Sequence, residues 1–308
     1  MPKVAVATTN PSSIDLEYDT FGDPGDPALL LIMGFTAQLT GWDEALCNQL
    51  AERGRYVIRY DNRDCGLSTK LEGVYVDVGA VMLAALAGAE VPPVPYKLAD
   101  MANDATGLLD QLGIEQAHVA GASMGGMIAQ TVAIEHPERV ASLVSIMSTT
   151  GERAVGHSTP EAIAALLAPP PADRDAYIDS SSRWATWASK RHVDHRALRD
   201  RAARDYDRSF YPEGGSRQLA AIYASGDRTQ ALRSLDMPTL VIHGRDDTLI
   251  TPSGGERTAA LIPGSNLLLV DDMGHDLPPP LWPLLIDAII DHTAPQRGRC
   301  ATPQAARR

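Results

Sequence analysis

Residues 119–126 read VAGASMGG and place a serine, Ser123, inside the pattern G-x-S-x-G. The stretch 116–121 has the composition of a buried strand, and 124–136 has that of a helix. The bare pentapeptide arises by chance in roughly one chain in ten of this length, so it carries little weight alone. Between a strand and a helix, however, it forms a sharp turn that exposes the serine hydroxyl. This stretch therefore predicts an α/β fold with a nucleophilic serine.

The chemistry of such a turn explains the two glycines. Side chains at Gly121 and Gly125 would crowd the turn, and the helix that begins at Met124 offers free N–H groups to a developing negative charge. A glycine-rich turn that binds a phosphate, or that only packs, is the alternative interpretation. The strand and helix on either side favour the nucleophile.

Strand and helix signals alternate on both sides of this turn. Strands are predicted at 28–33, 55–60, 116–121, 140–147, 239–243 and 266–270, and helices at 43–54, 98–112, 124–136 and 281–292. Alternation of this kind predicts a mostly parallel sheet that is covered by helices.

Residues 151–233 break the alternation. They hold no good buried strand, are rich in Ala, Arg and Asp, and carry a predicted helix at 185–206. We therefore predict a core of residues 1–150 and 234–293, with 151–233 inserted as a helical cap. Residues 294–308 are polar and basic, and we expect them to be a disordered tail.

A serine nucleophile needs a base and an acid that orients the base. Of the eight histidines, His275 is the best candidate for the base, because it follows the last predicted strand in the loop DDMGHD, residues 271–276. For the acid, Asp246 and Asp247 both lie in the loop after strand 239–243. At least one of the two is expected to accept turn N–H groups, as aspartates in such loops commonly do. The residues themselves leave the choice between them open.

The order serine, acid, histidine is that of the α/β-hydrolases, which this chain resembles over residues 14–293. The resemblance implies a catalytic triad of Ser123, Asp247 and His275, since the family's acid usually stands three residues after the glycine at position 244. Asp246 would then be left to accept turn N–H groups or to pair with Arg245.

Further motifs carry the same resemblance. Residues 31–35, LIMGF, look like the family's oxyanion loop: Gly34 lets the chain turn, and the N–H groups of Phe35 and Met124 would hold the oxyanion. Residues 61–68, DNRDCGLS, are similar to a D-x-R-x-x-G-x-S loop, whose Asp61 and Arg63 we expect to pin the loop beside the site. The closest likeness is to bacterial esterases of the aclacinomycin methylesterase type and to lipase- and carboxylesterase-like proteins.

The expected function is that of a carboxylic ester hydrolase working through an acyl-enzyme on a small, hydrophobic ester. Alternatives on the same triad are a thioesterase, a C–C hydrolase or a cofactor-free haloperoxidase or perhydrolase, and a non-catalytic ligand-binding protein is the alternative from another class. Nothing in the sequence calls for a metal or an organic cofactor. Within the insertion, Trp184, Trp187 and Tyr223 either line the pocket or form the cap's own core.

Composition sets limits on partners and location. The 308 residues carry a net charge of −12, which disfavours nucleic acid and anionic membrane surfaces as partners. We see no apolar run of the ~20 residues that a membrane span needs and no signal-peptide core, so we expect a cytoplasmic protein. The three cysteines, Cys47, Cys65 and Cys300, are too widely spaced for a disulfide framework or a zinc site. The oligomeric state is left open.

Overall fold

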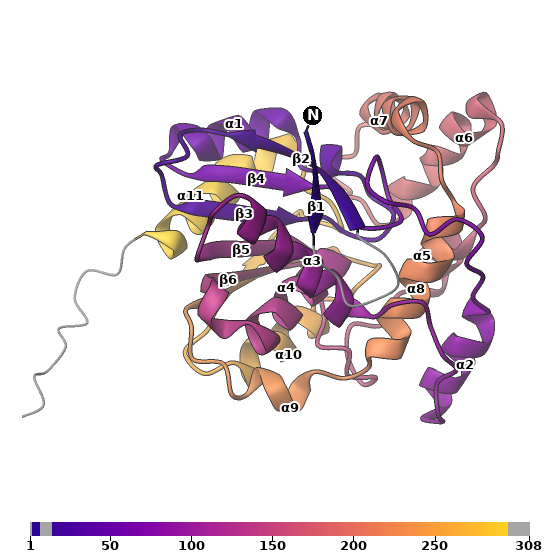
Figure 1. Ribbon diagram of the computed structural model, residues 1–308. Coiled ribbons are helices and arrows are strands. Elements are labelled where there is room, and N and C mark those ends of the chain that lie inside the picture. Colours follow the sequence, from indigo (N-terminus) through magenta and orange to yellow (C-terminus); the bar gives the residue numbers. More distant parts are fainter. Residues whose placement is uncertain (1, 7–13, 295–308) are drawn as a thin grey trace, which may run out of the picture.

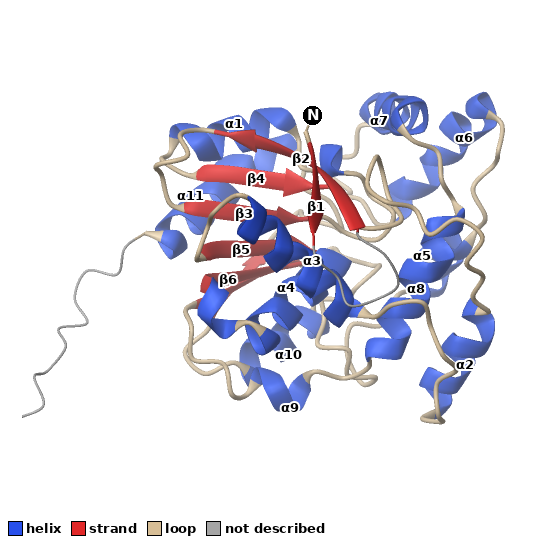
Figure 2. Ribbon diagram, in the orientation of Figure 1, coloured by secondary structure: helices blue, strands red, loops and turns tan. Residues whose placement is uncertain are grey.

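A single eight-stranded sheet runs through the protein, which is described by a computed structural model over residues 2–6 and 14–294. The strands are β1 (Lys3–Val6), β2 (Ile14–Phe21), β3 (Ala28–Ile32), β4 (Tyr56–Tyr60), β5 (Ala117–Ala122), β6 (Val140–Ile146), β7 (Thr239–Gly244) and β8 (Asn266–Val270). Their order in the sheet is β1-β2-β4-β3-β5-β6-β7-β8. Figures 1 and 2 show the part of the sheet from β2 through β4, β3 and β5 to β6. Strands β3 to β8 pair in parallel, and β1 and β2 pair antiparallel.

Helices cover both faces of the sheet. The helices are α1 (Glu44–Glu52), α2 (Val78–Ala87), α3 (Leu98–Gln111), α4 (Met124–Glu135), α5 (Pro160–Leu167), α6 (Arg174–Ser180), α7 (His195–Arg208), α8 (Glu213–Ser225), α9 (Thr229–Leu232), α10 (Ser253–Leu261) and α11 (Trp282–Thr293). Along β3, Leu29 and Leu31 enter the core that contains α1 and α11, while Leu30 and Ile32 enter the core that contains α3 and α4. Because successive strand side chains point to opposite faces, a continuous apolar run is buried on both sides.

Most predicted elements form within one or two residues of the predicted bounds. Outside the inserted segment, the strands β1 and β2 and the helices α2 and α10 were not predicted from the sequence. The predicted helix 185–206 is wrong in its first half: 181–186 is a short 3₁₀ helix, and α7 begins only at His195. The reason is local, since the Asp194 side chain accepts hydrogen bonds from the N–H groups of Arg196 and Ala197 and so caps a new helix there.

Residues 151–233 contain helices α5 to α9 and no strand, in keeping with the predicted insertion. Helices α5 to α8 lie to one side of the sheet, beside the carboxyl ends of the parallel strands, and α2 lies next to α8 (Figures 1 and 2). The bounds of a separate cap at 151 and 233 stay a prediction.

Cys47 and Cys65 are buried free thiols. Cys300 and residues 295–308 of the predicted tail lie outside the described residues. Within the described ranges, no helix is both long and apolar enough to cross a membrane.

Candidate active site

Ser123 occupies a sharp turn between β5 and α4. Its backbone has φ 58° and ψ −120°, in the left-handed half of conformational space that non-glycine residues rarely adopt. A Cβ atom added at Gly121 would lie 2.0 Å from the carbonyl oxygen of Gly125, and one added at Gly125 would lie 2.0 Å from that of Ile32. Both positions therefore require glycine, for the crowding reason inferred from the sequence.

The structure brings the three predicted triad residues together. The Nε2 atom of His275 lies 2.9 Å from the Ser123 Oγ, and its Nδ1 atom lies 2.7 Å from the Asp247 Oδ2. His275 comes from the loop after β8 and Asp247 from the loop after β7, at the carboxyl ends of two neighbouring parallel strands. An unbroken chain of hydrogen bonds thus joins the hydroxyl, the imidazole and the buried carboxylate.

The Asp247 carboxylate also organises its own loop. Its Oδ1 atom accepts hydrogen bonds of 2.9 Å from the N–H groups of both Leu249 and Ile250. The expectation that Asp246 would take such bonds is wrong, because one carboxylate of Asp247 has two oxygens with separate partners. No hydrogen bond or ion pair joins the Asp246 side chain to another described residue.

Arg245 does not pair with Asp246 either, because its guanidinium forms an ion pair of 2.7 Å with Asp271. This pair is exposed, so it contributes little to stability.

Electrostatics keep the Asp247 carboxylate ionised. Burial acts to raise its pKa, but the attraction of His275 and a hydrogen bond from His243 outweigh burial and lower the pKa to about 2. The His243 Nε2 lies 3.5 Å from the Asp247 Oδ2 and 2.8 Å from the carbonyl oxygen of Ile250. A carboxylate with this pKa is negative at neutral pH and can stabilise an imidazolium.

Two backbone N–H groups close to Ser123 lack an acceptor within the part of the chain that the structure describes. A Cβ atom added at Gly34 would lie 3.1 Å from the Ser123 Cβ, so the loop after β3 passes directly beside the serine. Met124 is the first residue of α4, where N–H groups have no intrahelical partner. Among the described residues, the N–H groups of Phe35 and Met124 have no hydrogen-bond acceptor. Their role as an oxyanion hole stays a prediction.

The histidine loop is attached to the inserted segment. The His275 N–H donates to the carbonyl oxygen of Trp187 over 2.7 Å, and the Gly274 N–H donates to the Ser189 Oγ over 2.9 Å. The Ser189 N–H in turn donates to Asp276 over 2.9 Å. The sequence analysis missed Ser189 and Asp276. The only available signal was that Asp276 directly follows the predicted base.

The three aromatic candidates for the pocket lie in different surroundings. Trp184 packs edge-on against Tyr177, with ring centroids 6.3 Å apart, in an aromatic cluster of the inserted segment. Tyr223 packs against the small apolar cluster that α2 shares with α8. Trp187 contacts the histidine loop through its backbone. A lining role for these side chains stays a prediction.

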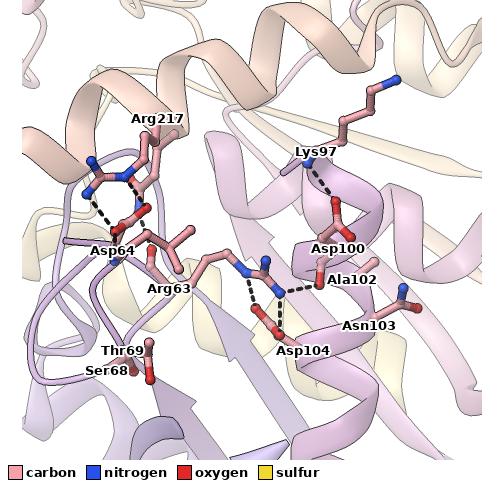
Figure 3. A network of polar contacts seen from close by, with 12 residues as sticks. Arg63, Asp64, Ser68, Thr69, Lys97, Asp100, Ala102, Asn103, Asp104 and Arg217 are labelled. Atoms are coloured by element: carbon pink, nitrogen blue, oxygen red, sulfur yellow. Dashed lines mark hydrogen bonds and ion pairs between the residues drawn. The ribbon is translucent and has the colours of Figure 1, made fainter. Parts of the chain in front are cut away.

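The loop after β4 is held at the site by buried ionic contacts. Asp61 accepts hydrogen bonds from the N–H groups of Leu39 and Leu67, over 2.6 and 2.8 Å, and pairs with Arg208. Arg63 forms two hydrogen bonds to Asp104 of α3 (Figure 3). Both motif residues therefore hold the loop in place through their buried partners.

A parallel sheet that carries a serine on a strand-to-helix turn, with a histidine and an acid on later loops, defines an α/β protein of the hydrolase type. The chain belongs to the family described as alpha/beta hydrolase fold, whose model matches residues 27–278.

Relatives of known function are similar over most of the chain. The Rhodomycin D methylesterases DauP of Streptomyces sp. (strain C5) and DnrP of Streptomyces peucetius are each 27% identical, over 91% of this chain and 95% of theirs. Among solved structures, the enol-lactonase from Burkholderia xenovorans LB400 superposes with a TM-score of 0.69 at 23% identity, covering 94% of this chain and 99% of that one. The structural likeness shows a shared fold.

Proposed function

We propose that the protein is a serine hydrolase that cleaves carboxylic esters through an acyl-enzyme. Ser123 is the nucleophile, His275 the general base and acid, and Asp247 the residue that orients His275. The observation that carries the proposal is the hydrogen-bond chain from the Ser123 hydroxyl to the ionised Asp247, with distances of 2.9 and 2.7 Å.

The first half of the reaction follows from these distances. The Ser123 Oγ attacks the ester carbonyl carbon while the His275 Nε2, already within hydrogen-bond distance, takes the hydroxyl proton. The carbonyl oxygen becomes an oxyanion beside the N–H groups of Phe35 and Met124. Loss of one such donor costs about 3–4 kcal/mol of transition-state stabilisation in enzymes of this kind. Asp247 balances the positive charge that His275 acquires.

The second half reverses the proton transfers. The bond between the carbonyl carbon and the leaving oxygen breaks, and His275 gives its proton to that oxygen, which releases the alcohol. A water molecule then attacks the acyl-enzyme while His275 takes a proton from it. The Ser123 oxygen leaves with that proton, and the carboxylic acid is released.

The relatives narrow the substrate class. Two relatives that match 91% of the chain are methylesterases, so we propose methyl esters of small organic acids as the first substrates to test. Another relative is a 3-oxoadipate enol-lactonase, 26% identical over 81% of this chain, and it favours an ester bond as well. C–C bond and thioester hydrolysis are outcomes that the same assay distinguishes.

The test compares two serine variants. Ser123→Ala should lose about 10⁴–10⁶-fold in turnover of p-nitrophenyl and methyl esters and should no longer react with a fluorophosphonate probe. Ser142→Ala is the matched control, because Ser142 is a buried serine that contacts His118 and not the triad, while Ser123 is half-buried. It should keep both the labelling and the turnover. Ester turnover by Ser123→Ala within about tenfold of the parent enzyme would contradict the mechanism. Faster turnover of acyl thioesters or of C–C substrates than of esters would correct the reaction class.

A further inference from the structure

One fully buried side chain from the inserted segment reaches the oxyanion loop. Gln218 lies on α8, and its Oε1 atom accepts the N–H of Thr36 over 2.8 Å. Its Nε2 atom donates to the carbonyl oxygen of Arg63 over 2.9 Å. These partners lie 182 and 155 residues away along the chain. The amide fits in one orientation, because one partner is a donor and the other an acceptor.

The backbone that Gln218 holds is strained. Thr36 has φ 55°, a left-handed value that costs a β-branched residue more than most. Such a conformation persists only where its surroundings impose it. The Thr36 N–H belongs to the peptide unit directly after Phe35, the residue that we propose as an oxyanion-hole donor. If the Thr36 peptide relaxed, the direction of the Phe35 N–H would change with it.

Helix α8, which carries Gln218, is itself held rigidly against the two loops. Arg217, the neighbour of Gln218, forms two hydrogen bonds of 2.8 Å to Asp64, and both side chains are buried (Figure 3). A Cβ atom added at Gly214 would lie 2.0 Å from the Asp64 carbonyl oxygen, and one added at Gly215 would lie 3.1 Å from the Thr36 side chain. The helix therefore packs as close to the two loops as backbone atoms allow.

The second partner of Gln218, the backbone of Arg63, is also held firmly in place. Arg63, whose carbonyl oxygen receives the Gln218 amide, is clamped to Asp104 by hydrogen bonds of 2.6 and 2.7 Å. Figure 3 shows Arg63 and Asp64, adjacent in the loop after β4, reaching in different directions to α3 and to α8. Gln218 thus ties the oxyanion loop to a rigid part of the core.

We propose that Gln218 is a positioning residue for the oxyanion hole: its amide holds the Phe35–Thr36 backbone so that the Phe35 N–H points at the substrate oxygen. The inference rests on the proposed function. Because the oxyanion exists in the transition state and not in the bound ester, loss of Gln218 should lower kcat and leave KM nearly unchanged.

The test shortens the side chain at position 218 by one methylene group. Gln218→Asn keeps an amide but is about 1.5 Å too short to reach both partners. A displacement of about 1 Å at an active site can cost about 10²-fold, so we expect kcat to fall at least about tenfold while KM stays within about threefold. A boronic acid, whose tetrahedral adduct on Ser123 places an oxygen in the same hole, should bind more weakly by a similar factor. Gln218→Met, which removes both hydrogen bonds at similar volume, should behave alike and serves if Gln218→Asn does not fold.

Gln130→Asn is the matched control. Gln130 is also fully buried, and it bonds to Ser145 and Arg228 rather than to the oxyanion loop. This variant should lose thermal stability comparably and keep kcat and boronic acid affinity. Unchanged kcat in a folded Gln218 variant, or a change confined to KM, overturns the positioning role. Ester turnover by Ser123→Ala would instead overturn the proposed function, so the two failures are distinguishable.

Discussion

Replacing Asp247 with asparagine should disable the proposed triad through the histidine tautomer. The Oδ1 position accepts two backbone N–H groups, from Leu249 and Ile250, each at 2.9 Å. An asparagine must place its carbonyl oxygen there, because its NH₂ group would otherwise face two donors. The NH₂ group is then left 2.7 Å from the His275 Nδ1. It can only donate, so it favours the tautomer in which Nδ1 is unprotonated and Nε2 carries the proton.

That tautomer cannot accept the Ser123 proton, because its Nε2 already holds one. The negative charge that would balance an imidazolium is lost as well. In the best-studied serine triad the equivalent change costs about 10⁴ in kcat. We expect a loss of that order here, because the two N–H groups bound at the Oδ1 position force the asparagine NH₂ group toward His275. The fold should remain, since asparagine preserves the shape and the two turn hydrogen bonds.

Asp246→Asn is the matched control. Its side chain has no hydrogen-bond or ion-pair partner among the described residues, so turnover should stay within about threefold of the parent. Both variants would be measured on one short-chain ester at neutral pH, with thermal unfolding followed in parallel. The reasoning fails if Asp246→Asn is the more damaging change. It fails equally if Asp247→Asn loses less than about a hundredfold.

Two further predictions concern buried groups outside the triad. Arg63→Met should destabilise the protein by about 3–5 kcal/mol in urea unfolding, because it leaves the buried Asp104 carboxylate without its partner. Arg174→Met, which breaks an exposed ion pair, should shift the midpoint far less, and equal shifts would refute the argument. Burial raises the pKa of Cys47 to about 12 and that of Cys65 well above its usual value. Both thiols therefore stay protonated below pH 9, and mass spectrometry after iodoacetamide treatment should find neither modified in the native protein.

The alternation of strands and helices was predictable because its signals are local. The buried strand β3 shows as an unbroken apolar run, and the turn at Ser123 shows as glycines spaced around a serine. The strands β1 and β2 were not predicted, since β1 is only four residues long and β2, IDLEYDTF, mixes polar and apolar residues without a continuous apolar run. The helix was predicted to start at residue 185, but α7 starts at His195, because the side chain of Asp194 caps its first turn.

For the candidate site, too, the kinds of residue could be predicted from the sequence, but their exact contacts could not. The sequence by itself determined the kinds of group that meet, a serine on a glycine turn, a histidine after the last strand and an aspartate after the strand before it. It left two aspartates open on residue grounds, because adjacent residues in a loop are equivalent until the backbone is folded. Only the tertiary structure decided that Asp247 both contacts His275 and accepts the turn N–H groups.

The hydrogen bonds that hold the loops around the site were decided by the tertiary structure alone. Gln218 meets Thr36, and Ser189 meets Asp276, across 182 and 87 residues of chain. Neither pair carries a spacing or periodic pattern, since each partner belongs to a different element and is brought close only when the inserted segment packs on the core. Hydrogen bonds of this kind depend on the final packing of distant segments, whereas strands, helices and tight turns follow from neighbours in sequence.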